Sequence, residues 1–344
     1  MPYRRVICTI DAHTEGTPER IVVSGLPPIP GDTMVEKNAY ARDHLDHVRK
    51  LLVNEPRGHR NMCGSYLTAP VSQDASYGVL FLEPGGYATM CGHGTIAICK
   101  ILVDHKMVNV IEPTTPIVLD TVAGTIRVDV EVCDGKAGAV TIWNVPSFLL
   151  AKDVVIQMPE YGKVAIDIAY GGNFYAILSA ESVGLTIEPQ YAEQIISAGV
   201  KLQEAINEQV DVHHPEEPRI DVVSFVQFYA EPRDDRATMR NVVVSPPAGI
   251  DRSPCGTGTS ARMASLFARN ELSLHEPFVH ESILGGLFYG ELVGESKVGP
   301  YDAVLPAIRG SAYIMGLNSF LLEDSDPYPE GFYMGKPGEL PGFH

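Results

Sequence analysis

Residues 91–97 read CGHGTIA, and residues 255–261 read CGTGTSA. These two heptapeptides share Cys, Gly, Gly, Thr and Ala at the same offsets, although 164 positions separate them. Each is followed by an apolar pattern typical of a helix, which continues to Val103 after the first copy and to Phe267 after the second. A repeat at this spacing predicts two related halves, each with a cysteine at the start of a helix.

A cysteine at a helix start has a particular chemistry. The exposed backbone N–H groups and the positive end of the helix dipole stabilise a thiolate, which lowers the thiol pKa below its free value of about 8.5. The glycines let the backbone approach a ligand, and the free N–H groups can hold a carboxylate. Such a cysteine is a candidate base or nucleophile. The alternative is that both segments are ordinary glycine-rich turns with buried cysteines.

Two equivalent thiols suggest a pair that faces one substrate across a cleft. Inversion of a carbon centre needs a base on one face and an acid on the other, with the roles exchanged in the reverse direction. Two thiols in opposite protonation states supply both groups. Because such thiols are coupled, their pKa values belong to the pair rather than to either residue.

Short alternating or β-branched runs dominate the rest of the chain and predict strands, whereas few segments have helical periodicity. Helices are expected over residues 36–53 and 190–209, and the Asp134-Gly135 pair predicts a hairpin turn. The regular alternation of a doubly wound sheet is missing, so the pattern favours an α+β or barrel-like α/β architecture. The expected strands are residues 6–10, 21–23, 79–82, 117–120, 125–132, 140–143, 222–228, 242–244 and 312–314.

Composition excludes several classes of protein. The 344 residues include 26 Lys and Arg against 43 Asp and Glu, which gives a net charge of −17, and 45% are hydrophobic. This apolar fraction supports a large core, whereas the negative charge argues against nucleic acid or an anionic membrane as a partner. No apolar run approaches the ~20 residues that span a bilayer, and the start lacks a signal peptide. We therefore expect a soluble, cytoplasmic protein.

The six cysteines are too sparse for a disulfide scaffold and contain no Cys-x-x-Cys spacing, so they are expected to be reduced thiols. Cys99 lies on a helical apolar stripe and Cys133 in a strand pattern, which predicts that both pack in the core. The single tryptophan, Trp143, is expected there as well. The His213-His214 pair lacks a third ligand in the nearby sequence, so no metal site is expected from it.

Two longer motifs carry a family resemblance. Residues 90–95 (MCGHGT) and 251–259 (DRSPCGTGT) resemble the two signatures of the proline racemase family, which includes 4-hydroxyproline 2-epimerases and 3-hydroxyproline dehydratases. The resemblance continues over most of the chain. Further matching segments are residues 11–16, 55–59, 171–174, 308–310 and 326–327.

The resemblance implies a fold similar to that of diaminopimelate epimerase. Two pseudo-symmetric domains are then expected, each a curled β-sheet around a central helix, with the active site in the cleft between them. The first domain would comprise residues 1–132 with about 312–344, and the second residues 133–311. The resemblance also implies a homodimer.

The resemblance further implies roles for individual residues. Cys91 and Cys255 would alternate as base and acid at the substrate Cα, without pyridoxal phosphate, another cofactor or a metal. Asp251 and His93 would hold the imino nitrogen of a small-molecule substrate, proline or hydroxyproline. The substrate carboxylate would be held by backbone N–H groups around Gly92, His93, Gly256 and Thr257.

Cysteine at both catalytic positions favours racemisation or epimerisation, because family dehydratases commonly keep only one of the two thiols. Cys63 and Ser245 lie where proline racemases resemble one another in carrying phenylalanine. Smaller walls leave room for a ring hydroxyl, whose burial without a partner would cost about 1–3 kcal/mol. These positions favour a 4-hydroxyproline 2-epimerase.

Other activities stay open at this stage. Residues 172–175 (GNFY) look more like racemase and dehydratase members of the family, which favours a proline racemase. A trans-3-hydroxy-L-proline dehydratase and a non-catalytic protein that binds an imino acid are the further alternatives.

Overall fold

The computed structural model describes residues 3–218, 220–245 and 249–334, so the ends of the chain expected in the first domain lie partly outside the described residues. The chain divides into two compact units. Unit 1 takes in the described residues up to Ile142 and those from Gly310 onward, and unit 2 comprises Trp143–Arg309. The mixed α/β fold expected from the sequence is confirmed.

The first boundary lies about ten residues beyond the position expected from the sequence, residue 132. Asp134 and Gly135 both have φ in the left-handed region, at 52° and 70°, as a tight two-residue turn requires. This turn joins β7 (Gly124–Cys133) directly to β8 (Lys136–Trp143), so the hairpin stays in unit 1.

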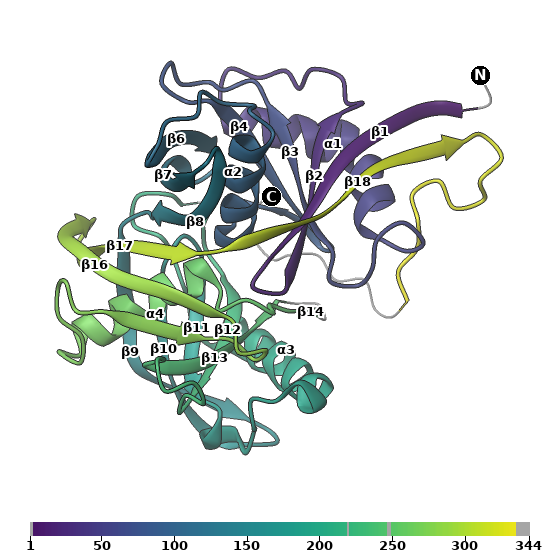
Figure 1. The fold of residues 1–344 in the computed structure, drawn as a ribbon. Helices are drawn as coiled ribbons and strands as arrows, with labels where there is room; N and C mark the ends of the chain where they lie inside the picture. Colours follow the sequence, from purple (N-terminus) through teal and green to yellow (C-terminus); the bar gives the residue numbers. More distant parts are fainter. Residues whose placement is uncertain (1–2, 219, 246–248, 335–344) are drawn as a thin grey trace. The chain divides into compact units, whose positions relative to one another are not determined.

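Unit 1 is a sheet with one helix on each face (Figure 1). Its ladder runs β18–β1–β2–β3–β4–β6–β7, in which β2–β3 and β4–β6 are parallel and the other pairs are antiparallel. Besides β7 and β8, unit 1 contains these elements, in chain order: β1 (Tyr3–Thr14), β2 (Thr17–Ser24), α1 (Met34–Val53), β3 (Cys63–Thr68), β4 (Tyr77–Glu83), β5 (Gly86–Ala88), α2 (Gly92–Asp104), β6 (Thr114–Thr121) and β18 (Ala312–Glu323).

Unit 2 is a closed ring of strands. Its ladder runs β9–β10–β11–β12–β13–β15–β16–β17, and β17 pairs again with β9. Its elements are β9 (Ser147–Met158), β10 (Gly162–Tyr170), β11 (Phe174–Ser179), the 3₁₀ turns η1 (Glu181–Val183) and η2 (Pro189–Tyr191), α3 (Ala192–Gln209), β12 (Val223–Ala230), β13 (Met239–Ser245), β14 (Gly249–Ile250), α4 (Gly256–Ala268), β15 (Phe278–Glu281), β16 (Leu287–Val298) and β17 (Tyr301–Gly310).

The two ladders repeat one pattern. Starting from β18 in unit 1 and from β9 in unit 2, the successive pairings are antiparallel, antiparallel, parallel, antiparallel, parallel and antiparallel. Helix α2 contacts β18, β1, β2 and β7, and α4 contacts the corresponding β9, β10, β11 and β16. Each heptapeptide therefore begins the helix enclosed by its own sheet.

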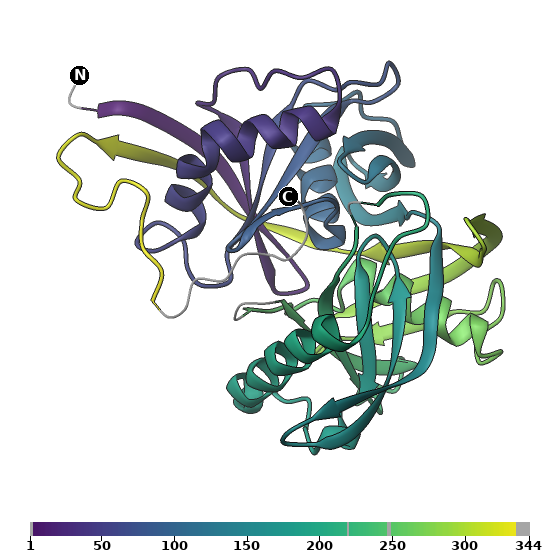
Figure 2. The same ribbon diagram turned by 180° about the vertical axis from the view of Figure 1, so that it is seen from behind.

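The helices explain why the sequence folds this way locally. The first turn of α1 is closed by a capping box between Thr33 and Glu36, and its apolar stripe packs on β3, β4 and β5. Helix α3 likewise covers β9, β12 and β13, as both views show (Figures 1 and 2). The helices expected over residues 36–53 and 190–209 are confirmed to within two residues at each end. By contrast, α2 and α4 are buried on nearly every side.

Two sequence expectations about the core are wrong. Trp143 is 40% exposed at the end of β8, and Cys133 is exposed at the end of β7. Side chains alternate between the two faces of a strand, and in both cases the preceding residue, Val132 or Ile142, takes the inward position. None of the helices in the described part of the chain combines the length and apolar character needed to cross a bilayer.

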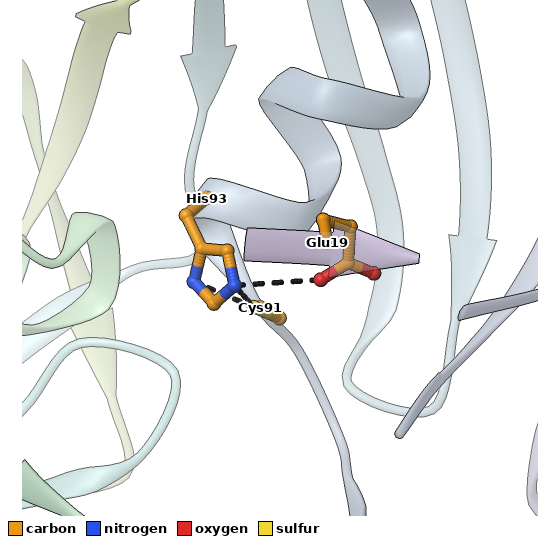
Figure 3. Close-up of side chains that lie close together, drawn as sticks. All are labelled: Glu19, Cys91 and His93. Carbon is orange, nitrogen blue, oxygen red and sulfur yellow. Dashed lines mark hydrogen bonds and ion pairs between the residues drawn. The ribbon is translucent and has the colours of Figure 1, made fainter. Parts of the chain in front are cut away.

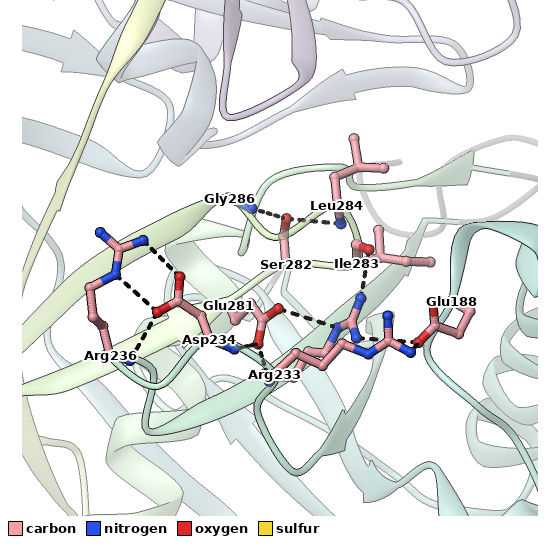
Figure 4. Close-up of polar contacts among 10 residues, drawn as sticks. Glu188, Arg233, Asp234, Arg236, Glu281, Ser282, Ile283, Leu284 and Gly286 are labelled. Carbon is pink, nitrogen blue, oxygen red and sulfur yellow. Dashed lines mark hydrogen bonds and ion pairs between the residues drawn. The ribbon is translucent and has the colours of Figure 1, made fainter.

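A buried ion network fastens the start of α3 to the ring of unit 2 (Figure 4). The Arg240 guanidinium lies 3.4 Å from Glu188 and 3.9 Å from Glu281, and it donates to the Ile283 carbonyl at 2.8 Å. Arg233 also contacts Glu188, and its backbone N–H donates to Glu281. Two carboxylates are thus held in the interior by one buried cation and backbone donors.

We expect Arg240→Met to lower the free energy of unfolding by about 3–5 kcal/mol, because it leaves Glu188 and Glu281 without their buried cation. Urea unfolding followed by circular dichroism measures the change. Arg236→Met is the matched control: Arg236 pairs with Asp234 at the exposed edge of the same network, so its unfolding midpoint should not move. Equal effects of the two substitutions would contradict this account.

Candidate active site

Cys91 caps the N-terminus of α2 and is 7% exposed. The backbone N–H and the hydroxyl of Thr95 both donate to the Cys91 carbonyl, at 3.0 and 2.8 Å, which fixes the start of the helix. The Cys91 sulfur lies 3.2 Å from Nδ1 and 3.6 Å from Nε2 of His93. The local sequence therefore brings a thiol and an imidazole into contact.

His93 lies between Cys91 and Glu19 of β2 (Figure 3). Its Nε2 atom is 3.4 Å from Oε2 of Glu19, and its carbonyl accepts the Thr14 hydroxyl at 2.8 Å. Glu19 is fully buried, and its Oε1 accepts a hydrogen bond from the Ser65 hydroxyl. Sequence reasoning missed Glu19. The available signal was an acidic residue at the head of the apolar strand Ile21–Val23.

Cys63 belongs to the same cluster. It begins β3, where it pairs with Glu19 on the ladder. Its thiol donates to Oε2 of Glu83 at 3.5 Å and is also hydrogen-bonded by the His93 side chain. A small polar side chain therefore lies beside His93 at the position where the sequence suggested a pocket wall.

The electrostatics of this cluster correct one expectation. Burial raises the pKa of Cys91 to about 11, although the His93 charge and hydrogen bond lower it in part. Burial also raises the pKa of Cys63 well above its ordinary value, and the Glu83 charge adds to this. The lowered thiol pKa predicted from the helix N-terminus is wrong for the free protein, because loss of hydration outweighs the helix dipole.

The pKa of His93 moves in the opposite sense. Burial lowers the pKa of the imidazole, but Cys91, Cys63 and Glu19 raise it by more, so the pKa ends well above its ordinary value. The protonated ring is thus favoured. An imidazolium beside the Cys91 sulfur stabilises the thiolate once the thiol proton is removed.

Cys255 is the N-cap of α4 and is 8% exposed, but its backbone conformation differs from that of Cys91, which is extended. Its φ of 64° lies in the left-handed region, which a residue with a side chain rarely adopts. Two hydrogen bonds hold this conformation: the Cys255 N–H donates to the Ser253 hydroxyl at 3.1 Å, and Asn241 donates to the Pro254 carbonyl at 2.8 Å. The sulfur accepts the Gly258 N–H at 3.4 Å.

Tyr175 supplies the contact that sequence reasoning missed in unit 2. It lies on β11, is 1% exposed, and its hydroxyl is 3.3 Å from the Cys255 sulfur and 2.6 Å from Oγ1 of Thr257. Burial raises the pKa of Cys255 to about 12 and the Asp251 charge adds to this, whereas the Tyr175 hydroxyl lowers it. Residues 172–175 had been noted only for their family resemblance.

The remaining expected residues surround the start of α4. The N–H and hydroxyl of Ser253 donate to Oδ1 of Asp251 at 2.9 and 2.8 Å, which orients this carboxylate just before Cys255. Gly256 and Thr257 form the first turn, as Gly92 and His93 do in α2. A Cβ on Gly171 would lie 2.2 Å from the Thr257 carbonyl, so only glycine permits this approach. Ser245 ends β13 opposite Gly249, and residues 246–248 lie outside the described residues.

The register shows that the missed residues occupy equivalent positions. Glu19 of β2 pairs with Cys63 of β3, and Tyr175 of β11 pairs with Phe225 of β12. The third residue of each heptapeptide is histidine in one copy and threonine in the other. The two thiols therefore cap equivalent helices but have different neighbours: charged and sulfur-containing groups around Cys91, and hydroxyl and aromatic groups together with the Asp251 charge around Cys255.

Comparison with known proteins identifies the family to which this chain belongs. The model of the family described as proline racemase matches residues 9–333. The chain belongs to the proline racemase family. The family resemblance of the motifs at residues 90–95 and 251–259 is confirmed, and the chain is an isomerase of the racemase and epimerase type.

Members of the proline racemase family with different names match it equally well. A 4-hydroxyproline 2-epimerase from Streptosporangium roseum is 48% identical over 97% of this chain and 100% of its own length. A proline racemase from Clostridioides difficile is 46% identical, with the same coverage of both chains. The crystal structure of a hydroxyproline epimerase from Agrobacterium vitis, with bound trans-4-hydroxy-L-proline, matches with a TM-score of 0.90 at 33% identity over 97% of each chain.

Proposed function

We propose that this chain is a cofactor-independent 4-hydroxyproline 2-epimerase in which Cys91 and Cys255 serve opposite faces of one substrate Cα. The observation that carries the proposal is the repeat: each unit holds one buried thiol at the N-terminus of its enclosed helix. A single thiol could serve a nucleophilic enzyme. A matched pair supplies the base and the acid that inversion requires.

In one direction, the Cys91 thiolate removes the Cα proton, and the C–H electron pair moves into the carboxylate group to form an enolate. The Cys255 thiol then donates its proton to the opposite face of Cα, which restores the carboxylate and leaves Cys255 as the thiolate. The reverse reaction begins from that state. Asp251 holds the protonated imino nitrogen, while helix N–H groups hold the carboxylate and stabilise the developing negative charge. His93 shares in holding the nitrogen as the neutral ring, because an imidazolium has no acceptor for a cationic N–H.

The surroundings of Cys63 support a hydroxylated ring as the substrate. Cys63 is small, and its partner Glu83 places a carboxylate beside it. A carboxylate accepts a hydrogen bond from a hydroxyl group, whereas it gains nothing from the methylene of unsubstituted proline. Ser245 would offer a second polar contact to the same ring. Proline racemisation is the alternative, favoured by residues 172–175.

One parallel assay tests these activities. L-Proline, trans-4-hydroxy-L-proline and trans-3-hydroxy-L-proline are each incubated with the protein in heavy water, and the products are followed by polarimetry and proton NMR. We expect epimerised 4-hydroxyproline with one deuterium at Cα. Faster inversion of proline would favour the racemase, and a cyclic imine from the 3-hydroxy compound would favour a dehydratase. Binding without exchange at Cα in any of the three would contradict an enzymatic role.

The Tyr175→Phe variant should invert its substrate about fivefold more slowly, because one hydrogen bond to the Cys255 sulfur is worth roughly 1 kcal/mol. Loss of this bond also raises the pKa of the Cys255 thiol, so iodoacetamide should modify Cys255 more slowly at a fixed pH. Mass spectrometry of the Cys255 peptide measures that rate. Tyr191→Phe, at an exposed position, should change neither rate.

The same proposal carries the expectation of a homodimer. Light scattering of the purified protein at micromolar concentration checks it, and a monomeric mass would contradict it.

A further inference from the structure

Three potential metal ligands from unit 1 converge beside Cys91. The Cys91 sulfur, a ring nitrogen of His93 and a carboxylate oxygen of Glu19 all lie within 4.8 Å of one another, and all three side chains are buried (Figure 3). They come from β2 and from the first turn of α2. Thiolate, imidazole and carboxylate are the ligand types that bind zinc in proteins.

The spacing of these donors fits a tetrahedral ion. Zinc bonds of about 2.3 Å to sulfur and about 2.1 Å to nitrogen or oxygen place tetrahedral neighbours roughly 3.5 Å apart for sulfur and nitrogen and roughly 3.4 Å apart for nitrogen and oxygen. Nε2 of His93 lies 3.6 Å from the Cys91 sulfur and 3.4 Å from Oε2 of Glu19. Both separations agree with those of ligands on one ion.

Glu19 gives independent support. Its Oε1 accepts the Ser65 hydroxyl, whereas its Oε2 forms no hydrogen bond among the described residues and is the oxygen that lies nearest His93. Burying a carboxylate oxygen without a hydrogen bond is costly. In the free protein the His93 imidazolium is the cation nearest this oxygen, and a metal ion bound to the neutral ring would take its place.

Cys63 lies beside this group without being part of it. It neighbours Glu19 on the β2–β3 ladder, but its sulfur is not among the ligand atoms that lie within 4.8 Å of one another. The three protein ligands therefore leave the fourth position of a tetrahedral ion open, which water can fill.

We propose that Cys91, His93 and Glu19 form a binding site for a thiophilic divalent cation such as Zn²⁺, and that the bound ion blocks Cys91. Binding converts the Cys91 thiol to the thiolate and the His93 imidazolium to the neutral ring, which coordinates through Nε2, so two protons are released to water. The ion keeps its charge of +2, so no oxidant or reductant is involved. Affinity should fall as the pH is lowered, because protons compete with the metal.

The second thiol provides an internal control. Cys255 is contacted by the hydroxyls of Tyr175 and Thr257, and its neighbour by register is Phe225 in place of Cys63. Neutral hydroxyls and an aromatic ring do not form a zinc site. Metal binding is therefore assigned to one of the two thiols that cap the enclosed helices.

Titration of the purified chain with Co²⁺ tests the site without any measurement of activity. We expect a thiolate-to-cobalt charge-transfer band and the visible bands of tetrahedral Co²⁺, both saturating at one ion per chain. Cys255→Ser should keep these bands, whereas Cys91→Ser and His93→Asn should lose them. The near-isosteric Glu19→Gln should weaken binding at least about tenfold. Circular dichroism confirms that each variant is folded.

Absence of the bands in the unmodified chain, or their equal loss in Cys255→Ser, would overturn the proposal. The inhibitory part rests on the proposed function: Zn²⁺ should suppress epimerisation, and EDTA should restore it. Cobalt bands in a protein that turns over none of the three imino acids would leave the metal site standing and remove the proposed function. A protein that epimerises an imino acid but shows no cobalt bands would support the proposed function and remove the metal site.

Discussion

Replacing either Cys91 or Cys255 with serine is expected to lower the rate of Cα inversion by at least about a thousandfold. A serine hydroxyl is a far weaker acid than a thiol, and general acid–base catalysis by one group contributes about 10²–10⁴ to a rate. Polarimetry on 4-hydroxyproline measures the loss. Since both thiols are needed for one inversion, each single substitution should be nearly as damaging as the double substitution.

Solvent exchange makes the test sharper. In Cys91→Ser, the Cys255 thiolate can still remove a proton from the one epimer that presents Cα–H to it, so deuterium exchange should persist for that epimer without inversion. Cys255→Ser should show exchange with the opposite epimer. Cys133→Ser, at an exposed thiol in the same chain, is the control and should behave like the unmodified protein. A nearly unchanged rate of inversion in Cys91→Ser or Cys255→Ser would contradict the two-thiol assignment.

The second large effect is expected from Asp251→Asn, which should reduce kcat/KM for epimerisation by about 10²–10³. The amide keeps the oxygen that accepts from Ser253, so the loop before α4 retains its shape. It loses the negative charge that, in the proposed mechanism, holds the protonated imino nitrogen, and one preorganised polar contact to the transition state is worth about that factor. Steady-state kinetics measure the change.

Asp234→Asn provides the comparison, because Asp234 is a carboxylate of the same unit that pairs with the exposed Arg236. Its kinetics should be unchanged. If Asp251→Asn left kcat/KM within a factor of three of the unmodified value, the assigned role of Asp251 would be wrong.

The two helix starts at Cys91 and Cys255 could be predicted from the sequence because their setting is local. A cap and the turn that follows it are formed by neighbouring residues, so the repeat at Cys91 and Cys255 specified two helix starts before any tertiary contact was considered. The same holds for His93, two residues from Cys91, and for Asp251, four residues before Cys255. Helices α1 and α3 were also predictable, because apolar periodicity is a local signal.

Glu19 and Tyr175 could not be found in this way. Each is separated from its thiol by 70 or more residues and lies near it only because β2 packs against α2 and β11 packs against α4. Strand pairing depends on contacts between distant segments, which periodicity does not specify. The strand faces of Cys133 and Trp143 were misjudged for a related reason: one residue of register changes a side chain from inward to outward.

The pKa values of the two thiols also combine a local effect, which the sequence indicates, with an effect that only the tertiary structure sets. From the sequence alone, the helix N-terminus was expected to lower both thiol pKa values, because that effect comes from the nearest backbone N–H groups. Burial, which raises them to about 11 and about 12, is a property of the enclosing sheet. The order of residues thus determined which atoms lie at the two helix starts, through short-range backbone geometry. Only the tertiary structure decided how far those atoms are removed from water and which charged groups lie near them. Both properties depend on contacts between segments that are distant in the sequence.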